Sequence, residues 1–303
     1  MLKRHSFTVP QRAAARTLRH VVFTLNSQVV DYPSVPQAGM IGFVVESGSP
    51  VMEPPPAASA GRRPGVAIEL NNVAWRAGGA GTDDSRVACV SLQVPPGQSL
   101  ALLSRPRGTA TALLDVIAGL RRPRAGELWV DGVAVHRLGG REAGRYRAGR
   151  GLVSPRFPLL TSLPVTDNVL AAPSASRPGA PAADRAVRLL EFAGITRLTV
   201  PVDRLTAEER WRVMIARALM PCPRLLLAED PATELESRAA DQVLDVLMDA
   251  HARSGFTLVL TAERPAAAVR CERRVSLVDG AVAEDEIAGD DDGWTRSRVD
   301  RIG

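Results

Sequence analysis

Short apolar runs of strand length alternate with segments of helical periodicity along most of this chain. Residues 99–103, 224–228 and 256–261 are largely apolar runs with the length of buried strands. Helical apolar spacing follows the first run, over residues 112–120, and separates the other two, over residues 239–253. Strands that alternate with helices in this way form a parallel sheet covered by helices. We therefore expect an α/β domain with a largely parallel sheet.

Further elements are expected around this pattern. Strands are predicted at residues 66–70, 89–94, 127–132 and 275–280, and helices at residues 183–193 and 207–219. Five arginines, at positions 137, 141, 145, 147 and 150, lie in a glycine-rich stretch that we expect to be a solvated loop. His251 is expected on the surface, near the end of its helix.

Composition divides the chain into three parts. Residues 1–65 contain two runs of strand composition, at 21–25 and 40–45, and end in a Pro- and Ala-rich stretch typical of a linker. We expect this extension to be disordered, or to be a leader translated from a misplaced start, with Met40 and Met52 as alternatives. Residues 66–284 carry the α/β pattern, and residues 285–303 form an acidic tail.

Composition and charge also limit the function. No apolar stretch approaches the roughly 20 residues of a spanning helix, and no secretory signal is recognisable. Three widely separated cysteines do not support a disulfide scaffold or a zinc site, so a reducing, cytosolic setting fits. The 38 basic residues exceed the 33 acidic ones by only five and are spread along the chain, which disfavours a nucleic-acid partner.

Lysine is almost absent from the chain. Lys3 is the only lysine among the 38 basic residues, and the other 37 are arginine. Any mechanism that needs a lysine within the α/β domain is therefore excluded.

A series of motifs in a fixed order identifies a family resemblance. The series comprises Ala118-Gly119-Leu120, Ala125-Gly126-Glu127-Leu128, Asp131-Gly132, residues 157–169, Leu205-Thr206-Ala207-Glu208-Glu209, residues 212–219 and residues 225–231. Residues 66–284 thereby resemble the nucleotide-binding subunit of an ABC transporter. Residues 157–169 are most similar to the branch that includes lipoprotein release and macrolide export. The resemblance implies a P-loop NTPase-like, mostly parallel sheet flanked by helices, with an antiparallel β subdomain and a helical insert at about residues 155–212.

The same resemblance implies ATP and Mg²⁺ as ligands, and it assigns roles to particular residues. In this family, backbone amides of a Gly-rich loop at a helix N-terminus bind phosphates, and acidic residues at a strand end support the metal and orient water. The phosphate loop aligns with Ser104, Arg105, Arg107, Gly108, Thr109, Ala110, Thr111 and Ala112. The metal positions are Thr111 and Glu229, the catalytic carboxylates are Asp230 and Glu229, and the signature-loop equivalent is Leu205, Thr206, Ala207 and Glu208.

Several of these positions depart from the family pattern. Ala110 stands at the position of the family's loop lysine, Pro155 at that of its glutamine and Ala262 at that of its switch histidine. Pro106 has no backbone N–H, so the loop has one amide donor fewer. Glu208 places a carboxylate where a phosphate is expected, and Glu229-Asp230 inverts the usual order of the two acidic residues. Two questions stay open at this point. Arg105 or Arg107 either replaces the missing charge or is simply solvated, and Trp75 either stacks on adenine or is a core residue.

The resemblance implies a cassette subunit of a membrane transporter, cytoplasmic and peripheral on the inner face of the cell membrane. Its partners would be a membrane-spanning subunit and a second cassette, in a homo- or heterodimer. The departures lead us to expect weak nucleotide binding with impaired or absent ATP hydrolysis, as in the degenerate half of a dimer. Two alternatives stay open: a slow ATPase with rearranged residues, and a non-catalytic scaffold or regulator that kept the fold.

Overall fold

The structure, a computed structural model, divides the chain into two units, Met1–Pro50 and Val51–Gly303. It describes residues 20–25, 28–33, 65–76, 87–173, 180–263, 265–288 and 294–296. In the first unit, strands β1 (His20–Leu25) and β2 (Gln28–Pro33) pair antiparallel, with Val22 opposite Asp31. The run of strand composition at residues 21–25 therefore lies in a strand. The expected strand at 40–45 and the linker lie outside the described residues.

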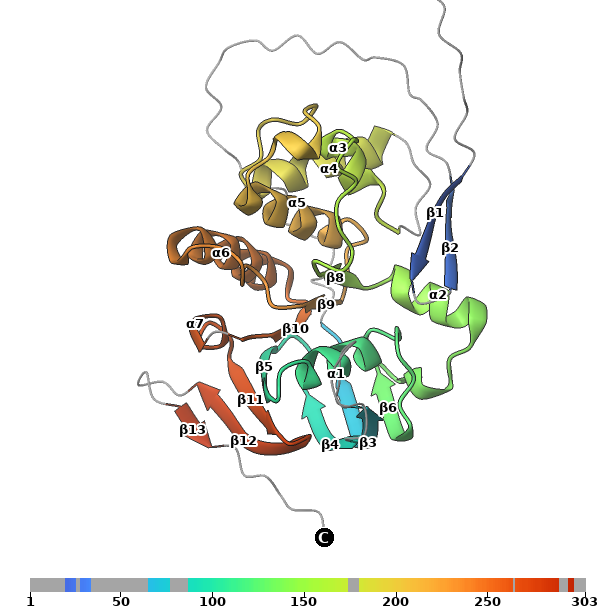
Figure 1. Ribbon diagram of the computed structural model, residues 1–303, viewed down its shortest axis with the longest axis vertical. Coiled ribbons are helices and arrows are strands. Elements are labelled where there is room, and N and C mark those ends of the chain that lie inside the picture. The colour runs from blue at the N-terminus through green and yellow to red at the C-terminus, as the bar shows by residue number, and fades with distance from the viewer. Residues whose placement is uncertain are drawn as a thin grey trace, which may run out of the picture. The chain divides into compact units, whose positions relative to one another are not determined.

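A mostly parallel sheet forms the centre of the second unit (Figure 1). Its parallel strands, in spatial order, are β11 (Arg273–Val278), β5 (Ser99–Arg105), β10 (Thr257–Thr261), β9 (Leu225–Ala228) and β8 (Gly151–Val153). Next to β11, β12 (Ala281–Ala288) and β13 (Trp294–Arg296) extend the sheet as antiparallel strands. Every residue of β9 and β10 is buried, as expected for strands covered on both faces.

A second, antiparallel sheet faces the first across one helix. It contains β4 (Val87–Val94), β3 (Ile68–Arg76), β6 (Ala125–Val130) and β7 (Val133–Ala134). Gly126 allows β6 to lie close against β3: its φ is +81°, and a Cβ there would lie 2.1 Å from the carbonyl oxygen of Asn72. Helix α1 (Thr109–Ile117) packs on strands of both sheets, and its buried Leu113 and Leu114 belong to the core that these elements share.

Among the remaining helices, the first packs beside α1, and the others lie on the opposite side of the parallel sheet. They are α2 (Gly140–Ala148), α3 (Val165–Leu170), α4 (Ala180–Phe192), α5 (Ala207–Leu219), α6 (Ser237–Ser254) and α7 (Pro265–Ala268), with short 3₁₀ helices at Val135–Arg137 and Val202–Arg204. Figure 1 shows α3, α4 and α5 lying together at one end of this unit. They share an apolar core with α6. The predicted fold class is confirmed, including the antiparallel subdomain and the helical insert.

Three local predictions are wrong. The arginine-rich stretch is helical over Gly140–Ala148 because Tyr146 anchors it: this ring is buried, and its hydroxyl donates a 2.7 Å bond to the carbonyl of Ile117. The predicted start of the acidic tail falls inside β12, which continues to Ala288. His251 is buried rather than exposed, and its Nδ1 lies 2.9 Å from the carbonyl oxygen of Phe256.

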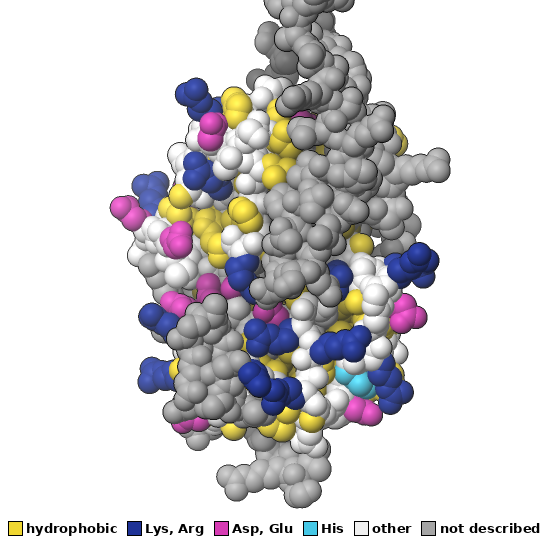
Figure 2. All heavy atoms as spheres, turned by 45° about the vertical axis from the view of Figure 1, so that its right-hand side comes forward, with side chains coloured by type: hydrophobic (Ala, Val, Ile, Leu, Met, Phe, Trp, Pro, Cys, Tyr) yellow, Lys and Arg dark blue, Asp and Glu magenta, His cyan; other side chains and the backbone are white. Residues whose placement is uncertain are grey.

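The surface of the described region is mixed in charge. Figure 2 shows basic side chains distributed over one face, with acidic side chains among them. None of the helices in the part of the chain that the structure describes combines the length and the apolar composition of a membrane span.

Candidate functional site

A cavity of about 760 Å³ lies at the carboxyl ends of the parallel strands. Its walls come from the turn after β5, from the ends of β9, β10 and β11, and from β12; they include Ser104–Gly108, Ala110, Thr111, Asp230, Ala262 and Glu263. Ligands of sheets of this kind bind at this edge, where loops from several strands converge. The cavity is therefore the candidate site, and it contains most of the predicted phosphate loop.

A hydrogen bond within the phosphate loop joins its beginning to its end. Gly108 precedes α1 with φ +89°, a left-handed conformation that suits glycine. The backbone N–H of Ala110 donates to the Ser104 hydroxyl at 3.1 Å, so the loop supplies its own acceptor for this amide. The side chain of Ala110 is a buried methyl group at the position where the family carries its lysine ammonium. Thr109 and Ala112 are also buried behind the loop.

The structure decides the roles of the loop arginines and of Trp75. Arg107 points to solvent: its side chain is 83% exposed, and it makes a 3.5 Å ion pair with Glu263. Arg105 is exposed as well. Trp75 is fully buried and donates from its indole N–H to the carbonyl oxygen of Thr109 at 3.3 Å. Trp75 is therefore a core residue that supports the loop from behind, and not a stacking platform.

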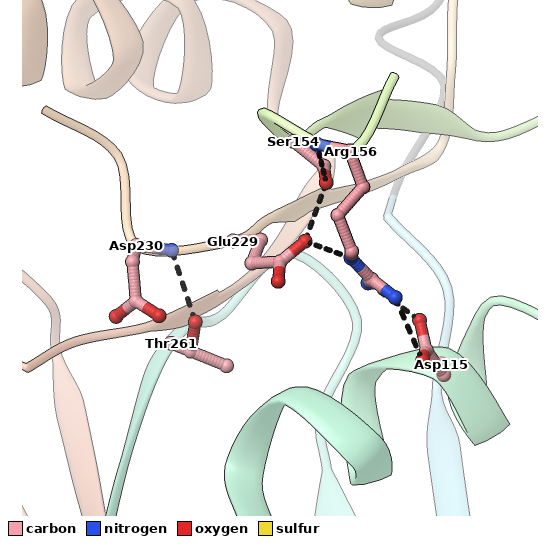
Figure 3. Close-up of polar contacts among 6 residues, drawn as sticks. All are labelled: Asp115, Ser154, Arg156, Glu229, Asp230 and Thr261. Atoms are coloured by element: carbon pink, nitrogen blue, oxygen red, sulfur yellow. Dashed lines mark hydrogen bonds and ion pairs between the residues drawn. The ribbon is translucent and has the colours of Figure 1, made fainter. Parts of the chain in front are cut away.

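The carboxylate of Glu229 is engaged in an ion pair with Arg156 and is not free to bind a metal ion. Figure 3 shows the Arg156 guanidinium between Glu229 and Asp115. Its Nε donates to Glu229 Oε2 at 2.6 Å, and its two terminal nitrogens donate to the two oxygens of Asp115 at 3.0 and 2.7 Å. Ser154 donates its hydroxyl to the same oxygen of Glu229. We call Arg156, Asp115 and Glu229 the arginine clamp.

The arginine clamp does not fit a divalent cation. Thr111 and Glu229 are the positions that the family uses for Mg²⁺, yet here one oxygen of Glu229 already accepts bonds from Ser154 and Arg156. Among the described residues no group of three or more His, Cys, Asp or Glu side chains is arranged to hold a metal ion. A fixed positive charge bonded to the expected ligand repels a second cation.

Asp230 lies beside the clamp but turns away from it. In Figure 3 its carboxylate lies on the Thr261 side, while that of Glu229 points to Arg156. Its backbone, at φ +40°, donates N–H to the Thr261 hydroxyl at 3.0 Å. Burial and the negative charges of Glu263 and Glu229 raise the pKa of Asp230. Its Oδ1 is buried without a hydrogen-bond partner among the described residues.

The signature-loop equivalent lies outside the cavity walls, at the start of α5. Leu205 is buried, and Thr206 caps the helix. The Thr206 hydroxyl accepts from the N–H of Glu209 at 3.1 Å, and the carboxylate of Glu209 accepts from the N–H of Thr206 at 2.8 Å. Glu208 pairs with Arg212 along the same helix. The first turn of α5, which begins at Ala207, therefore carries its own negative charges.

The two remaining family positions hold apolar residues. Pro155 is exposed directly before Arg156. Ala262 is buried, and its N–H donates to the carbonyl oxygen of Leu102 at 3.0 Å. His251 lies at the far end of α6 against Phe256, so it does not take the place of the switch histidine.

Most of the predicted loop and Asp230 line the cavity, whereas the clamp was not predicted. Two signals were available in the sequence. Asp115 interrupts an apolar helical run one turn after Thr111, and Arg156 follows the glutamine position. Neither signal indicates that the side chains of Asp115 and Arg156 are in contact.

Comparison with known proteins gives the family. The ABC transporter family model matches residues 87–233. An uncharacterized ABC transporter ATP-binding protein of Mycobacterium tuberculosis is 31% identical over 221 residues, which cover 70% of this chain and 87% of that protein. A lipoprotein-releasing system ATP-binding protein, LolD 1, of Caulobacter vibrioides is 34% identical over 66% of this chain and 88% of its own length.

Solved structures agree with these relatives. A dimeric bacterial ABC transporter cassette is similar with a TM-score of 0.63 and 25% identity, over 73% of this chain and 98% of that one. The same cassette in a post-hydrolysis state bound to ADP and Pi is similar in fold at 24% identity. With relatives above 30% identity matched over most of their length, this chain belongs to the family of ABC transporter ATP-binding proteins.

Proposed function

We propose that this ABC transporter cassette binds ATP weakly in the cavity at the phosphate loop and hydrolyses it slowly or not at all. The observation that carries the proposal is the buried methyl group of Ala110 at the helix N-terminus. The chain has no lysine beyond Lys3 to supply the missing ammonium group.

The expected size of the defect follows from the groups that are absent. A charge-assisted bond to phosphate contributes roughly 1.5–3 kcal/mol. Loss of one preorganised donor to the transition state costs about 10²–10³ in rate. Ala110, Pro155 and Ala262 each remove such a group. Their effects do not add, because groups that act as a unit lose most of their contribution with the first deletion.

Binding and turnover are measured separately on the purified chain. Isothermal titration with ATP and Mg²⁺ is expected to give a weak but saturable signal, and phosphate release is expected to stay far below the roughly 1–10³ s⁻¹ of typical enzymes. Any residual turnover should fall with Asp230→Asn, whose side chain lines the cavity. Turnover in the ordinary range that Asp230→Asn abolishes would contradict the proposal.

The relatives support a place for the chain in a transporter. We propose that it works on the inner face of the cell membrane, bound to a membrane-spanning subunit through the insert of α3, α4 and α5, and paired with a second cassette. LolD 1 is named as part of a lipoprotein-releasing system, and its 34% identity supports that branch over the methionine importer MetN, at 30%. Membrane fractionation tests the location: the chain should leave the membrane fraction in cells that lack the membrane-spanning subunit.

One observation favours a second candidate, a scaffold without nucleotide. The amide of Ala110 is already bonded to Ser104, so a phosphate must displace an existing hydrogen bond to use it. A thermal-shift titration separates the two candidates. An increase in the melting temperature with ATP supports the cassette that binds weakly, and no change at millimolar ATP supports the scaffold.

A further inference from the structure

The arginine clamp places a fixed positive charge in the region that the family reserves for a metal ion. Asp115 lies one helical turn after Thr111 on α1, so both residues are on the same face of that helix. Glu229 follows the end of β9, and Arg156 follows β8. The guanidinium thus joins α1 to the ends of two neighbouring strands, through three hydrogen bonds of 2.6 to 3.0 Å.

The clamp is built as a unit. Asp115 and Glu229 are buried, and the two N–H donors on Asp115 form a bidentate pair, the strong form of this contact. The backbone N–H of Arg156 also donates to Ser154 at 3.1 Å, and Ser154 is bonded to Glu229. The side chain of Arg156 therefore bonds Glu229 directly, and its backbone N–H is linked to the same carboxylate through Ser154. Burial disfavours the charge, but the bonds and charges of Asp115 and Glu229 outweigh it and raise the pKa of Arg156.

The charges explain why two carboxylates are tolerated there. Two buried carboxylates without a cation would repel each other and lose solvation. One guanidinium contacts both of them through Nε and the terminal nitrogens, and it cancels one of their two negative charges. None of the three clamp residues lines the cavity in the described part of the chain. Asp230, the next residue after Glu229, does line it.

We propose that Arg156 takes the place of the divalent cation in this cassette, so that the site excludes metal and any nucleotide enters without it. This proposal rests on the proposed function for one of its two parts, the entry of nucleotide without metal. The other part, the exclusion of metal by Arg156, does not require that nucleotide binds. A divalent cation that approached Glu229 would have to break the bond to Arg156 and then lie beside a guanidinium. Arg156 uses three of its five N–H donors in the clamp, and its side chain is 40% exposed, so two donors remain for an anionic ligand.

The first test uses Mn²⁺ alone, detected by electron paramagnetic resonance on the purified full chain. The wild type is expected to show no binding below millimolar concentration. Arg156→Gln frees Asp115 and Glu229, so it should bind Mn²⁺ at least tenfold more tightly than the wild type. Arg156→Lys keeps a positive charge and should exclude Mn²⁺ like the wild type, and the double variant Arg156→Gln/Glu229→Gln should lose the gain.

Arg270 provides a matched control. It also bridges two carboxylates, those of the exposed Asp241 and Asp245 on α6, and none of these three residues lines the 760 Å³ cavity. Arg270→Gln should leave Mn²⁺ binding unchanged. Wild-type binding of Mn²⁺ below millimolar concentration that Glu229→Gln removes would overturn the proposal. So would an Arg156→Gln variant that folds and gains no Mn²⁺ affinity.

The second test needs only the wild type, so it does not depend on whether a variant folds. ATP affinity is measured by titration calorimetry in 5 mM MgCl₂ and in EDTA. The two dissociation constants should agree within about threefold. An affinity more than tenfold higher with Mg²⁺ overturns the proposal. If ATP binds in neither buffer, the proposed function fails and the metal-free entry of nucleotide fails with it, while the Mn²⁺ result still decides whether Arg156 excludes metal.

Discussion

Replacement of Arg156 by alanine should destabilise the Val51–Gly303 unit by about 2 kcal/mol. Removal of one partner from a buried ion pair typically costs about 3–5 kcal/mol, because the charge left behind is desolvated and unpaired. Exposed pairs contribute about 0–1 kcal/mol. The clamp lies between these limits: Asp115 and Glu229 are 6% and 8% exposed, but the Arg156 side chain is 40% exposed, so water can replace part of what is lost.

Urea and thermal unfolding, followed by circular dichroism, measure this effect. For a unit of this size, 1 kcal/mol corresponds to about 2–4 °C, so the melting temperature should fall by about 4–8 °C. Arg270→Ala is the control, because Arg270 bridges Asp241 and Asp245, which are 52% and 61% exposed. Its loss should not exceed about 1 kcal/mol.

A double-mutant cycle identifies the source of the effect. In an Asp115→Asn background the carboxylate that makes the bidentate contact is gone, so Arg156→Ala should cost clearly less there than in the wild type. Equal losses for Arg156→Ala and Arg270→Ala, or a cycle with no coupling between Arg156 and Asp115, would refute the reasoning that the clamp is a buried, cooperative unit.

Three further predictions concern the loop, the cavity and α5. Ala110→Lys should tighten ATP binding by about 10- to 100-fold, since a charge-assisted bond contributes roughly 1.5–3 kcal/mol; unchanged calorimetric affinity would show that the loop does not hold phosphate. Asp230→Asn should raise the melting temperature at pH 7.5 and by clearly less at pH 3.5: the raised pKa of Asp230 means that its ionisation opposes folding, and below its ordinary pKa of 3.8 the group is mostly protonated in both states. A gain that is equal at both pH values would contradict this. Thr206→Ala should cost about 1 kcal/mol in urea unfolding through loss of the capping box, and Thr206→Ser should cost less; equal losses would assign the effect to the methyl group.

Local sequence signals predicted the elements of this fold well where periodicity and caps agree. Helix α5 has the predicted bounds, Ala207–Leu219, because an apolar face follows directly on a threonine cap. Strand β9 begins at Leu225, one residue after the predicted start at Arg224, and ends at Ala228 as predicted, since its apolar run is buried in a covered parallel sheet. Helix α2 was missed because its sequence is polar, and tertiary bonds from Tyr146 to Ile117 and from Arg147 to Gly119 hold it in place.

The site was predictable only in part. The phosphate loop and Asp230 follow from an ordered motif pattern, which fixes their place along the chain. The arginine clamp depends on contacts between residues 41 and 73 positions apart in the sequence. Neither periodicity nor local spacing encodes such a pairing, and in a chain with 37 arginines no single arginine stands out. Only the folded arrangement, in which α1 packs on β5 and β10 beside the strands that precede Arg156 and Glu229, brings these three groups together.

The turn before the first helix of a nucleotide-binding protein often has two roles: it binds the ligand, and it orders the start of the helix. The hydrogen bond between Ser104 and Ala110 separates these roles here. In many nucleotide-binding proteins the turn before the first helix is ordered by its ligand. Here the serine hydroxyl fills that role from within the polypeptide, and Trp75 supports the turn from the opposite side. Substitutions that weaken the hold on a ligand therefore leave the helix start intact, and descendants of this protein can lose the small molecule while they keep the architecture.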